Sequence, residues 1–407
     1  MVEFITAIIY IIRQGAQFIQ FDKSVIWGGN LDPFYLIAPI FLVSIMKDRV
    51  KLNKWFGIVI ILISYSIIQI IFNPEINILK LSVNIIKIVG CLMIMIYIKN
   101  YYNKISFPHI IVYASIMLGT FTLFALFYNQ SVLWILNDTV NKYDLIRLKL
   151  LYLEPSELGF HVLILLVFLI GFLLKAKLKS TKIVLTICIV MDFFVLFYTK
   201  SIGAIIIGAL SILVMITMDW YTNKTTEKTK IYLGVIAVAV GVLIVMISTK
   251  SSILMRVFGI LQGQDASIWY RVKVSFDVTF KAVWDFKGLG FGFGNLNTPG
   301  FLVLYKDLGF VHVLVNSFLY FIVEGGVFAI VFIMLLFSKL FNATISSKSI
   351  IKWGLLIFLI VYQFFGSHFT NALIWILYGI ILSEFDEFSY SEPIFKNFDN
   401  WIETREG

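Results

Sequence analysis

Two carboxylates flank a proline at the start of a very apolar segment. Residues 152–160 read YLEPSELGF, and HVLILLVFLIGFLLK follows directly. Glu157 suits the first turn of a helix, where an acidic side chain meets the positive end of the helix dipole. Glu154 precedes Pro155, which keeps it out of helical angles, so its side chain can project from the loop. Arg147 lies upstream. Spacing alone does not decide whether Glu154 only marks the start of the helix or is a functional group.

Four cations fall in segments that we expect between helices, and they form a candidate anion site. An arginine presents a rigid fork of donors that matches phosphate oxygens in pairs. Several such groups around one cavity can hold a diphosphate without a metal ion. Each alone is equally compatible with a lipid headgroup or an ordinary ion pair, with Asp144, Asp265 or Asp277 as the partner. The four cations are Arg147, Lys200, Arg256 and Arg271.

A histidine stands where the longest expected outer loop enters an apolar helix. His312 is one of four histidines in the chain, and Asn316 follows one turn later. Histidine is a common general base because its pKa is near neutral, although a single histidine is also a frequent interfacial residue. Within expected spans, Asp192 and Glu324 mark either a transport pathway or an internal pair, and Lys87 is a candidate partner for Glu324.

The stretch GLGFGFG (288–294) has glycines at alternate positions but matches no phosphate-binding loop. It lacks both GxxxxGK[ST] and a GxGxxG placed between a strand and a helix, so we exclude nucleotide binding here. Its alternation with Leu and Phe predicts a tight loop that dips into the membrane interface. No clustered His and carboxylate spacing is present either, so we expect neither a metal site nor a cofactor.

Composition indicates a polytopic integral membrane protein. The 407 residues are 60% hydrophobic and 14% charged, whereas soluble domains are about a quarter charged. The net charge of +9 is typical of basic cytoplasmic loops, so we do not expect nucleic acid as a partner. Cys91 and Cys188 lie inside apolar runs, which argues against a disulfide framework.

We expect a single all-α membrane domain over 1–407 with about twelve transmembrane helices. The first segment could instead lie in the interface, and the last two could be one broken helix. The expected spans are 2–20, 32–46, 55–72, 81–98, 108–128, 157–174, 182–198, 201–219, 231–248, 313–337, 352–368 and 370–384.

Alternate loops are rich in Lys and Arg, which places them and both termini in the cytoplasm. The longest remaining loops, 129–156 and 249–312, then face outward. Apolar spacing in VLWILNDTVNKYDLIRLKLLY and RVKVSFDVTFKAV predicts that both loops are partly helical, with helices lying on the membrane surface.

Three stretches carry a resemblance to a known family. IRLKLLYLEPSELG (146–159) is similar to an arginine followed by Glu-Pro-Ser at a helix start. Arg271 followed by VWDFKGLGFGFG (283–294) is similar to an arginine, a short helix and a glycine-rich turn. VHVLVNSFLYFIVEGGVFAI (311–330) resembles the helix after the family's main outer loop. In this order, the chain resembles the Wzy-type polysaccharide polymerases of the O-antigen ligase/polymerase superfamily.

The resemblance implies a GT-C-like fold and an inverting glycosyltransferase in the bacterial cytoplasmic (inner) membrane. Such an enzyme uses glycans carried on undecaprenyl diphosphate and joins their repeat units at the outer face, for capsule or O-antigen synthesis. Neither a metal nor a cofactor is implied. The lipid bilayer surrounds it, and a flippase and chain-length regulator proteins are the expected protein partners.

The resemblance also suggests roles for single residues. Arg271 would grip the donor diphosphate, and Arg147 would do likewise or orient Glu154. The family often has arginine after serine at the short outer turn, where this chain has Ile202, so Lys200 takes the cation role. The family's histidine often directly precedes asparagine, whereas here it stands four residues earlier, so either His312 or Glu154 would be the base. Arg256 and Asn316 complete the expected substrate-binding set.

Two other functions remain open. A ligase of the same superfamily would move a finished glycan to a different acceptor. A transporter or lipid-glycan flippase would show a central charged cavity and repeated halves. The cations of this chain concentrate in the outer loops and we find no convincing duplication of the halves, so an enzyme is favoured.

Overall fold

The chain is a mostly helical membrane protein. The computed structural model describes residues 53–102, 107–128, 132–135, 146–152, 154–176, 178–222, 259, 262–263, 266–311, 314–347, 349–366 and 369–384. The expected spans 2–20, 32–46 and 231–248, together with both termini, lie outside these residues. The total of about twelve spans and the GT-C-like architecture therefore stay predictions.

Within the described residues, six helices are long and apolar enough to cross a bilayer, which confirms the membrane class. They are α4 (Ile78–Tyr101), α5 (Phe107–Phe127), α6 (Pro155–Lys175), α7 (Lys179–Thr199), α8 (Ile202–Thr222) and α14 (Ser317–Ser347). Three more apolar helices accompany them: α3 (Asn53–Phe72), α15 (Ile350–Tyr362) and α16 (Ala372–Leu382). The last two are separate helices that contact each other, with Asn371 capping α16 through its side chain.

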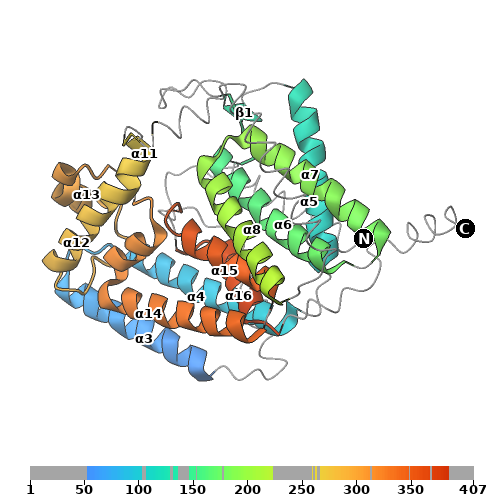
Figure 1. Ribbon diagram of the computed structural model, residues 1–407. Helices are drawn as coiled ribbons and strands as arrows, with labels where there is room; N and C mark the ends of the chain where they lie inside the picture. The colour runs from blue at the N-terminus through green and yellow to red at the C-terminus, as the bar shows by residue number, and fades with distance from the viewer. Residues whose placement is uncertain are drawn as a thin grey trace, which may run out of the picture.

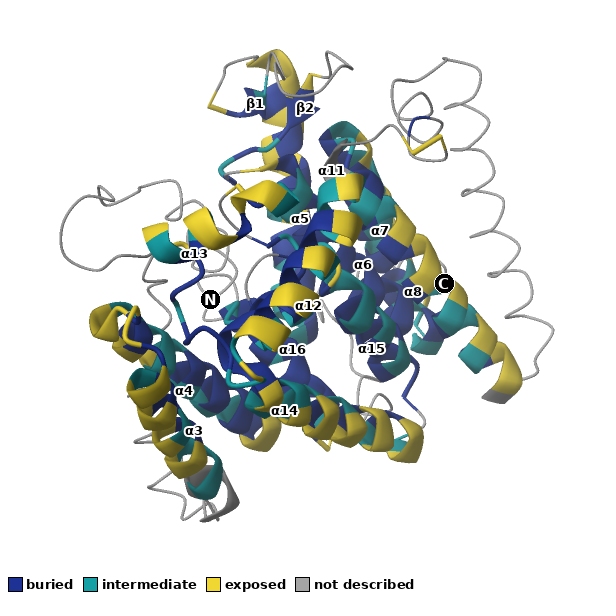
Figure 2. Cartoon of the chain, turned by 90° about the vertical axis from the view of Figure 1, so that its left-hand side faces the viewer, coloured by how far each residue is buried: buried dark blue, intermediate teal, exposed yellow. Residues whose placement is uncertain are grey.

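The helices form two groups (Figure 1). In one group, α5, α7, α8 and α15 pack around α6, and in the other α16 packs on α4, with α3 and α14 beside them. Contacts of α15 with α16 and α14 join the groups. Helix α6 is apolar on every side and is the most buried span, as its dark blue ribbon in Figure 2 shows. A helix without a polar face needs neighbours all around it, which explains its central place.

Helix α14 is a hairpin of two arms and not the single continuous helix expected over 313–337. Gly326 adopts φ 54° and ψ −137° inside it. The rings of Phe318 and Phe337 lie 5.2 Å apart and those of Phe321 and Phe332 lie 6.1 Å apart, so the arms 317–325 and 327–347 run antiparallel. At 1.5 Å per residue the first arm is about 14 Å long and the second about 31 Å. Only the second arm is long enough to span a bilayer.

The glycine-rich loop closes over the tip of this hairpin, and we call residues 288–294 with 323–327 the glycine junction. The N–H of Phe291 donates to the Val323 carbonyl at 2.8 Å, and that of Val327 donates to the Gly288 carbonyl at 2.8 Å. Gly290 has φ 76°, and a Cβ there would lie 2.5 Å from the Glu324 carbonyl oxygen. The backbones approach so closely that a side chain has no room. The predicted tight loop is therefore confirmed, and it pairs with the broken helix.

The segment expected as the first outer loop begins and ends as strands where we expected a surface helix. Strand β1 (Trp134–Ile135) pairs antiparallel with β2 (Arg147–Leu148). The indole N–H of Trp134 donates to the Ala125 carbonyl in α5 at 2.9 Å. This bond ties β1 back to the end of α5, so the helix predicted across these residues is wrong at its described ends.

The described residues of the segment expected as the second outer loop include several helices, as its spacing predicts. It contains α11 (Ala266–Trp269), the π-helical turn η2 (Tyr270–Val274), α12 (Ser275–Asp285), α13 (Pro299–Tyr305) and the 3₁₀ turn η3 (Lys306–Leu308). Val274, Val278 and Ala282 face inward, in a small core with Phe291 and Phe301. Phe280 and Trp284 face outward, 72% and 85% exposed. Their location in the membrane interface stays a prediction.

Candidate functional site

Arg147 is positioned by the small sheet. Strand β2 packs against α7, and the guanidinium Nε of Arg147 donates to the Thr199 carbonyl at 3.1 Å. The side chain is buried, with 9% of its surface exposed. A guanidinium has five N–H donors in a planar fork, and the bond from Nε to the end of α7 orients that plane.

Lys200 lies beside Arg147, in the turn between α7 and α8. It ends α7 in the left-handed conformation, with φ 49°, and its N–H donates to the Phe197 carbonyl. Burial, followed by the positive charge of Arg147, lowers the pKa of the Lys200 ammonium below its usual value. Two cations from segments that we expect on the outer side are thus held close together, an arrangement that a bound anion would stabilise.

The two glutamates at the start of α6 occupy different environments. Glu154 has extended angles (φ −130°, ψ 145°) directly before Pro155, as predicted for a residue that precedes a proline. Its exposed carboxylate accepts a hydrogen bond from Ser156 Oγ at 3.0 Å. Glu157 is half-buried and lies close enough to Tyr362 to interact with it electrostatically. The sequence analysis interpreted Glu157 only as a residue of the helix start and did not predict its contact with Tyr362.

Arg271 sits on η2 and points into the protein. Its guanidinium carbon lies 5.5 Å from the ring centre of Phe365, in the turn 363–366 that follows α15. A Cβ on Gly203 would lie 3.2 Å from the same ring and 3.7 Å from Phe160. Arg271 and the first turn of α8 therefore lie against the same Phe365 ring. A π-helical turn inside a helix is uncommon and frequently marks a functional position.

Asn316 begins the first arm of α14 and is 1% exposed. Its Oδ1 accepts the N–H of Leu319 at 3.1 Å, and the N–H of Ser317 donates to the Gln363 carbonyl at 2.7 Å. The N-terminus of this nine-residue arm thus lies on the same 363–366 turn as Arg271. A helix N-terminus carries a partial positive charge, which adds to that of the neighbouring guanidinium.

The structure therefore brings most of the predicted site residues to one end of the bundle. Arg147 and Lys200 meet at the start of α8, and Arg271, Asn316 and Glu157 meet around the 363–366 turn. The two sets are joined where a Cβ on Gly159 of α6 would lie 3.0 Å from Ser201. Arg256 and His312 lie outside the described residues, so their places in the site stay predictions.

This arrangement suits an anion with several oxygens. Three cations and a helix N-terminus come from four different elements, while carboxylates stand at the start of α6. Within the described residues, no group of three His, Cys, Asp or Glu side chains could hold a metal ion. No model of a known protein family matches the chain, and no curated protein matches it either.

Proposed function

We propose that this protein is a membrane glycosyltransferase that joins oligosaccharide repeat units carried on undecaprenyl diphosphate. In this proposal it is a GT-C-like, Wzy-type polymerase of the bacterial cytoplasmic membrane. Both termini lie in the cytoplasm, and the reaction takes place at the outer face. The growing chain moves from its own lipid carrier onto the repeat unit of a second carrier.

The observation that carries the proposal is the convergence of Arg147, Lys200 and Arg271. They come from three segments far apart in the sequence, yet all reach the ends of α6, α7 and α8. A diphosphate has several charged oxygens and can contact more than one cation at once. A site at the end of a membrane bundle also suits a substrate with a charged head and a polyprenyl tail.

The proposed chemistry is a single displacement. A hydroxyl oxygen of the acceptor sugar attacks the anomeric carbon of the donor, and the bond from that carbon to the diphosphate oxygen breaks. The hydroxyl proton passes to Glu154 or His312, because a positioned base assists such an attack. Negative charge grows on the leaving undecaprenyl diphosphate, where fixed cations stabilise the transition state. The proposal needs no metal ion or cofactor.

The test uses the purified full-length protein in liposomes with lipid-diphosphate-linked repeat units. A ladder of longer glycans, with release of undecaprenyl diphosphate, supports the polymerase. Transfer only to a different added acceptor would identify a ligase instead. Movement of the lipid-linked glycan across the bilayer without any new glycosidic bond would overturn the proposal in favour of a flippase.

A further inference from the structure

A buried carboxylate links the outer loop to the membrane helices. Glu324 is 1% exposed and stands at the tip of the α14 hairpin. Its Oε1 accepts the N–H of Gly294 at 2.8 Å, and its Oε2 accepts from Nδ2 of Asn84, in α4, at 3.1 Å. The hydroxyl of Tyr320 also bonds to this carboxylate. One side chain therefore connects α4, α14 and the glycine-rich loop.

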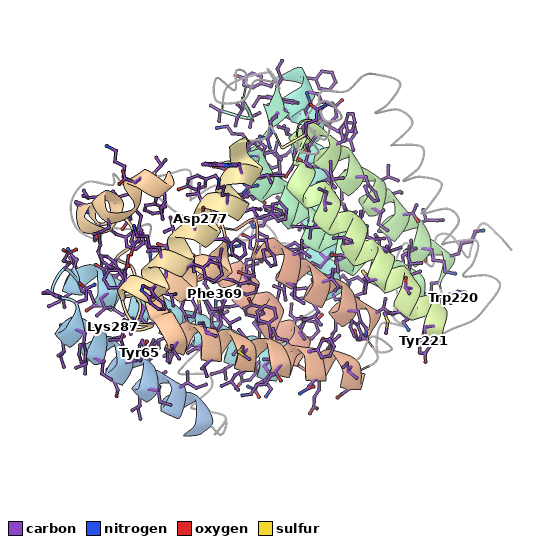
Figure 3. All side chains as sticks on the ribbon, turned by 60° about the vertical axis from the view of Figure 1, so that its left-hand side comes forward. Tyr65, Trp220, Tyr221, Asp277, Lys287 and Phe369 are labelled. Carbon is purple, nitrogen blue, oxygen red and sulfur yellow. The ribbon has the colours of Figure 1, made fainter. Side chains whose placement is uncertain are left out.

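The backbone of the same residue holds the same loop. The Glu324 carbonyl accepts the N–H of Gly292 at 3.0 Å and Nε2 of Gln69, in α3, at 2.8 Å. The same Gln69 amide nitrogen also donates to the Leu289 carbonyl at 2.7 Å. The hydroxyl of Tyr65 also donates to that carbonyl. Figure 3 shows Tyr65 close to Lys287, the residue that precedes the loop. The loop cannot slide along α14 without breaking both the side-chain and the backbone bonds of Glu324.

The loop is continuous with the helix that carries Arg271. The N–H of Gly288 donates to the Val283 carbonyl at 2.8 Å and closes the last turn of α12. Arg271 precedes Val274, Val278 and Ala282 by three, seven and eleven residues, so it shares their buried face. Fourteen residues of helix separate Arg271 from Asp285, about 21 Å at 1.5 Å per residue. A shift at the glycine junction is therefore transmitted along α12 to the guanidinium.

We propose that Glu324 is a positioning residue that sets where Arg271 meets the donor diphosphate. This inference rests on the proposed function. Glu324 touches no reacting atom in it. The two carboxylate oxygens and the backbone carbonyl of Glu324 hold the loop at one place on the hairpin tip. Because α12 connects this loop to Arg271, the position of the loop determines the position of the guanidinium.

The test exploits a reciprocal exchange between Glu324 and Asn84. In Glu324→Gln an NH₂ replaces one acceptor oxygen, so it either faces the N–H of Gly294 or forces the Asn84 amide to turn over and present its Oδ1. In the double variant Glu324→Gln/Asn84→Asp, the new amide donates to the new carboxylate, so the bond is restored with its direction reversed. We expect Glu324→Gln to lower kcat/KM for the lipid-linked donor by about 100-fold, as small misplacements of catalytic groups do. The double variant should recover most of that loss.

A distance measurement separates positioning from a direct role in chemistry. Asp277 on α12 and Tyr221 at the far end of α8 are both exposed, and native Cys91 and Cys188 are buried. Spin labels on Asp277→Cys and Tyr221→Cys should give a narrow distance distribution in the parent protein. The distribution should shift or broaden with Glu324→Gln and return in the double variant.

An activity loss without any change in this distribution would overturn the positioning role, and so would unchanged activity in Glu324→Gln. If Glu324→Gln does not fold, Asn84→Ala removes a single bond to the carboxylate and takes its place in both measurements. The distance measurement does not depend on turnover. A parent protein without transferase activity but with the expected distance changes would overturn the proposed function and leave the mechanical link intact.

Discussion

The glycine junction and the cation site lie at opposite ends of α12 and are built differently. At the junction, backbone hydrogen bonds hold the segments together. Glycines there adopt the backbone angles and leave the space that the close approach requires. Five of the junction's glycines have positive φ: Gly288, Gly290, Gly292, Gly294 and Gly326. At the cation site, long charged side chains extend from a strand, a helix end and a π-helical turn. One region fixes a position, whereas the other presents charge to a ligand.

This difference implies that the two regions fail in different ways. A change at the junction forces backbones apart and should reduce stability together with activity. A change at Arg271, which is only half-buried, removes a charge from the cation site and should reduce activity far more than stability. Each experiment below tests this separation.

The largest effect is expected from Gly290→Ala. The new methyl would meet the Glu324 carbonyl and the Gly326 nitrogen at 2.5 and 2.6 Å, at a φ that disfavours any side chain. Overpacking and backbone strain together should lower the free energy of unfolding by about 2–5 kcal/mol. Thermal unfolding in detergent measures it. The matched control is Gly57→Ala in α3, where nothing lies within 4 Å, and equal unfolding of both variants would contradict the close approach.

Arg271→Ala should reduce kcat/KM about 100- to 1,000-fold, because it removes a cation from the developing negative charge. Its unfolding temperature should stay near that of the parent protein. Arg271→Lys should recover only part of the activity, since an ammonium lacks the planar fork. The control is Lys273→Ala, two residues along on the exposed surface. Near-normal turnover in Arg271→Ala would end its assignment to the diphosphate.

Glu154→Gln should slow turnover by about 100-fold if Glu154 is the base, without a change in stability. Ser156→Ala removes only the hydroxyl that donates to this carboxylate and should have a smaller effect. A steady-state assay of undecaprenyl diphosphate release at several pH values measures both. If Glu154→Gln retains full activity, the base must be sought at His312, with His312→Ala as the next variant.

The smallest effect concerns pH. The pKa of Lys200 is lowered by burial and by Arg147, so its charge is lost as the pH rises through a value below about 10.4. Donor affinity should weaken through that range. Arg147→Gln should raise the pKa of Lys200 and move this alkaline limb to higher pH, whereas Arg147→Lys should leave it in place. The donor KM as a function of pH gives the result, and a limb that does not move would show that Arg147 does not influence Lys200.

Local sequence signals predicted much of the bundle. Most described spans begin and end within three residues of their expected bounds, because long apolar runs have few alternatives in a bilayer, whereas α14 continues to Ser347 and α15 ends at Tyr362. Pro155 placed Glu154 outside the helix, and the alternating glycines indicated a tight loop. The hairpin of α14 was missed because its arms look like one apolar run, and only Gly325–Gly326 marked the break. The inward contact of Glu157 was missed because its neighbour, Tyr362, lies two hundred residues further along the chain.

The glycine junction also has a consequence for how the protein is made. Gln69 in α3 donates to a carbonyl 220 residues further along the chain. At a synthesis rate of 5–20 residues per second, that carbonyl leaves the ribosome roughly 10–45 s after Gln69. During that interval, the amide must be satisfied by water, lipid headgroups or the insertion machinery. The junction is therefore a late step in assembly, because it can close only after residue 327 has been synthesised.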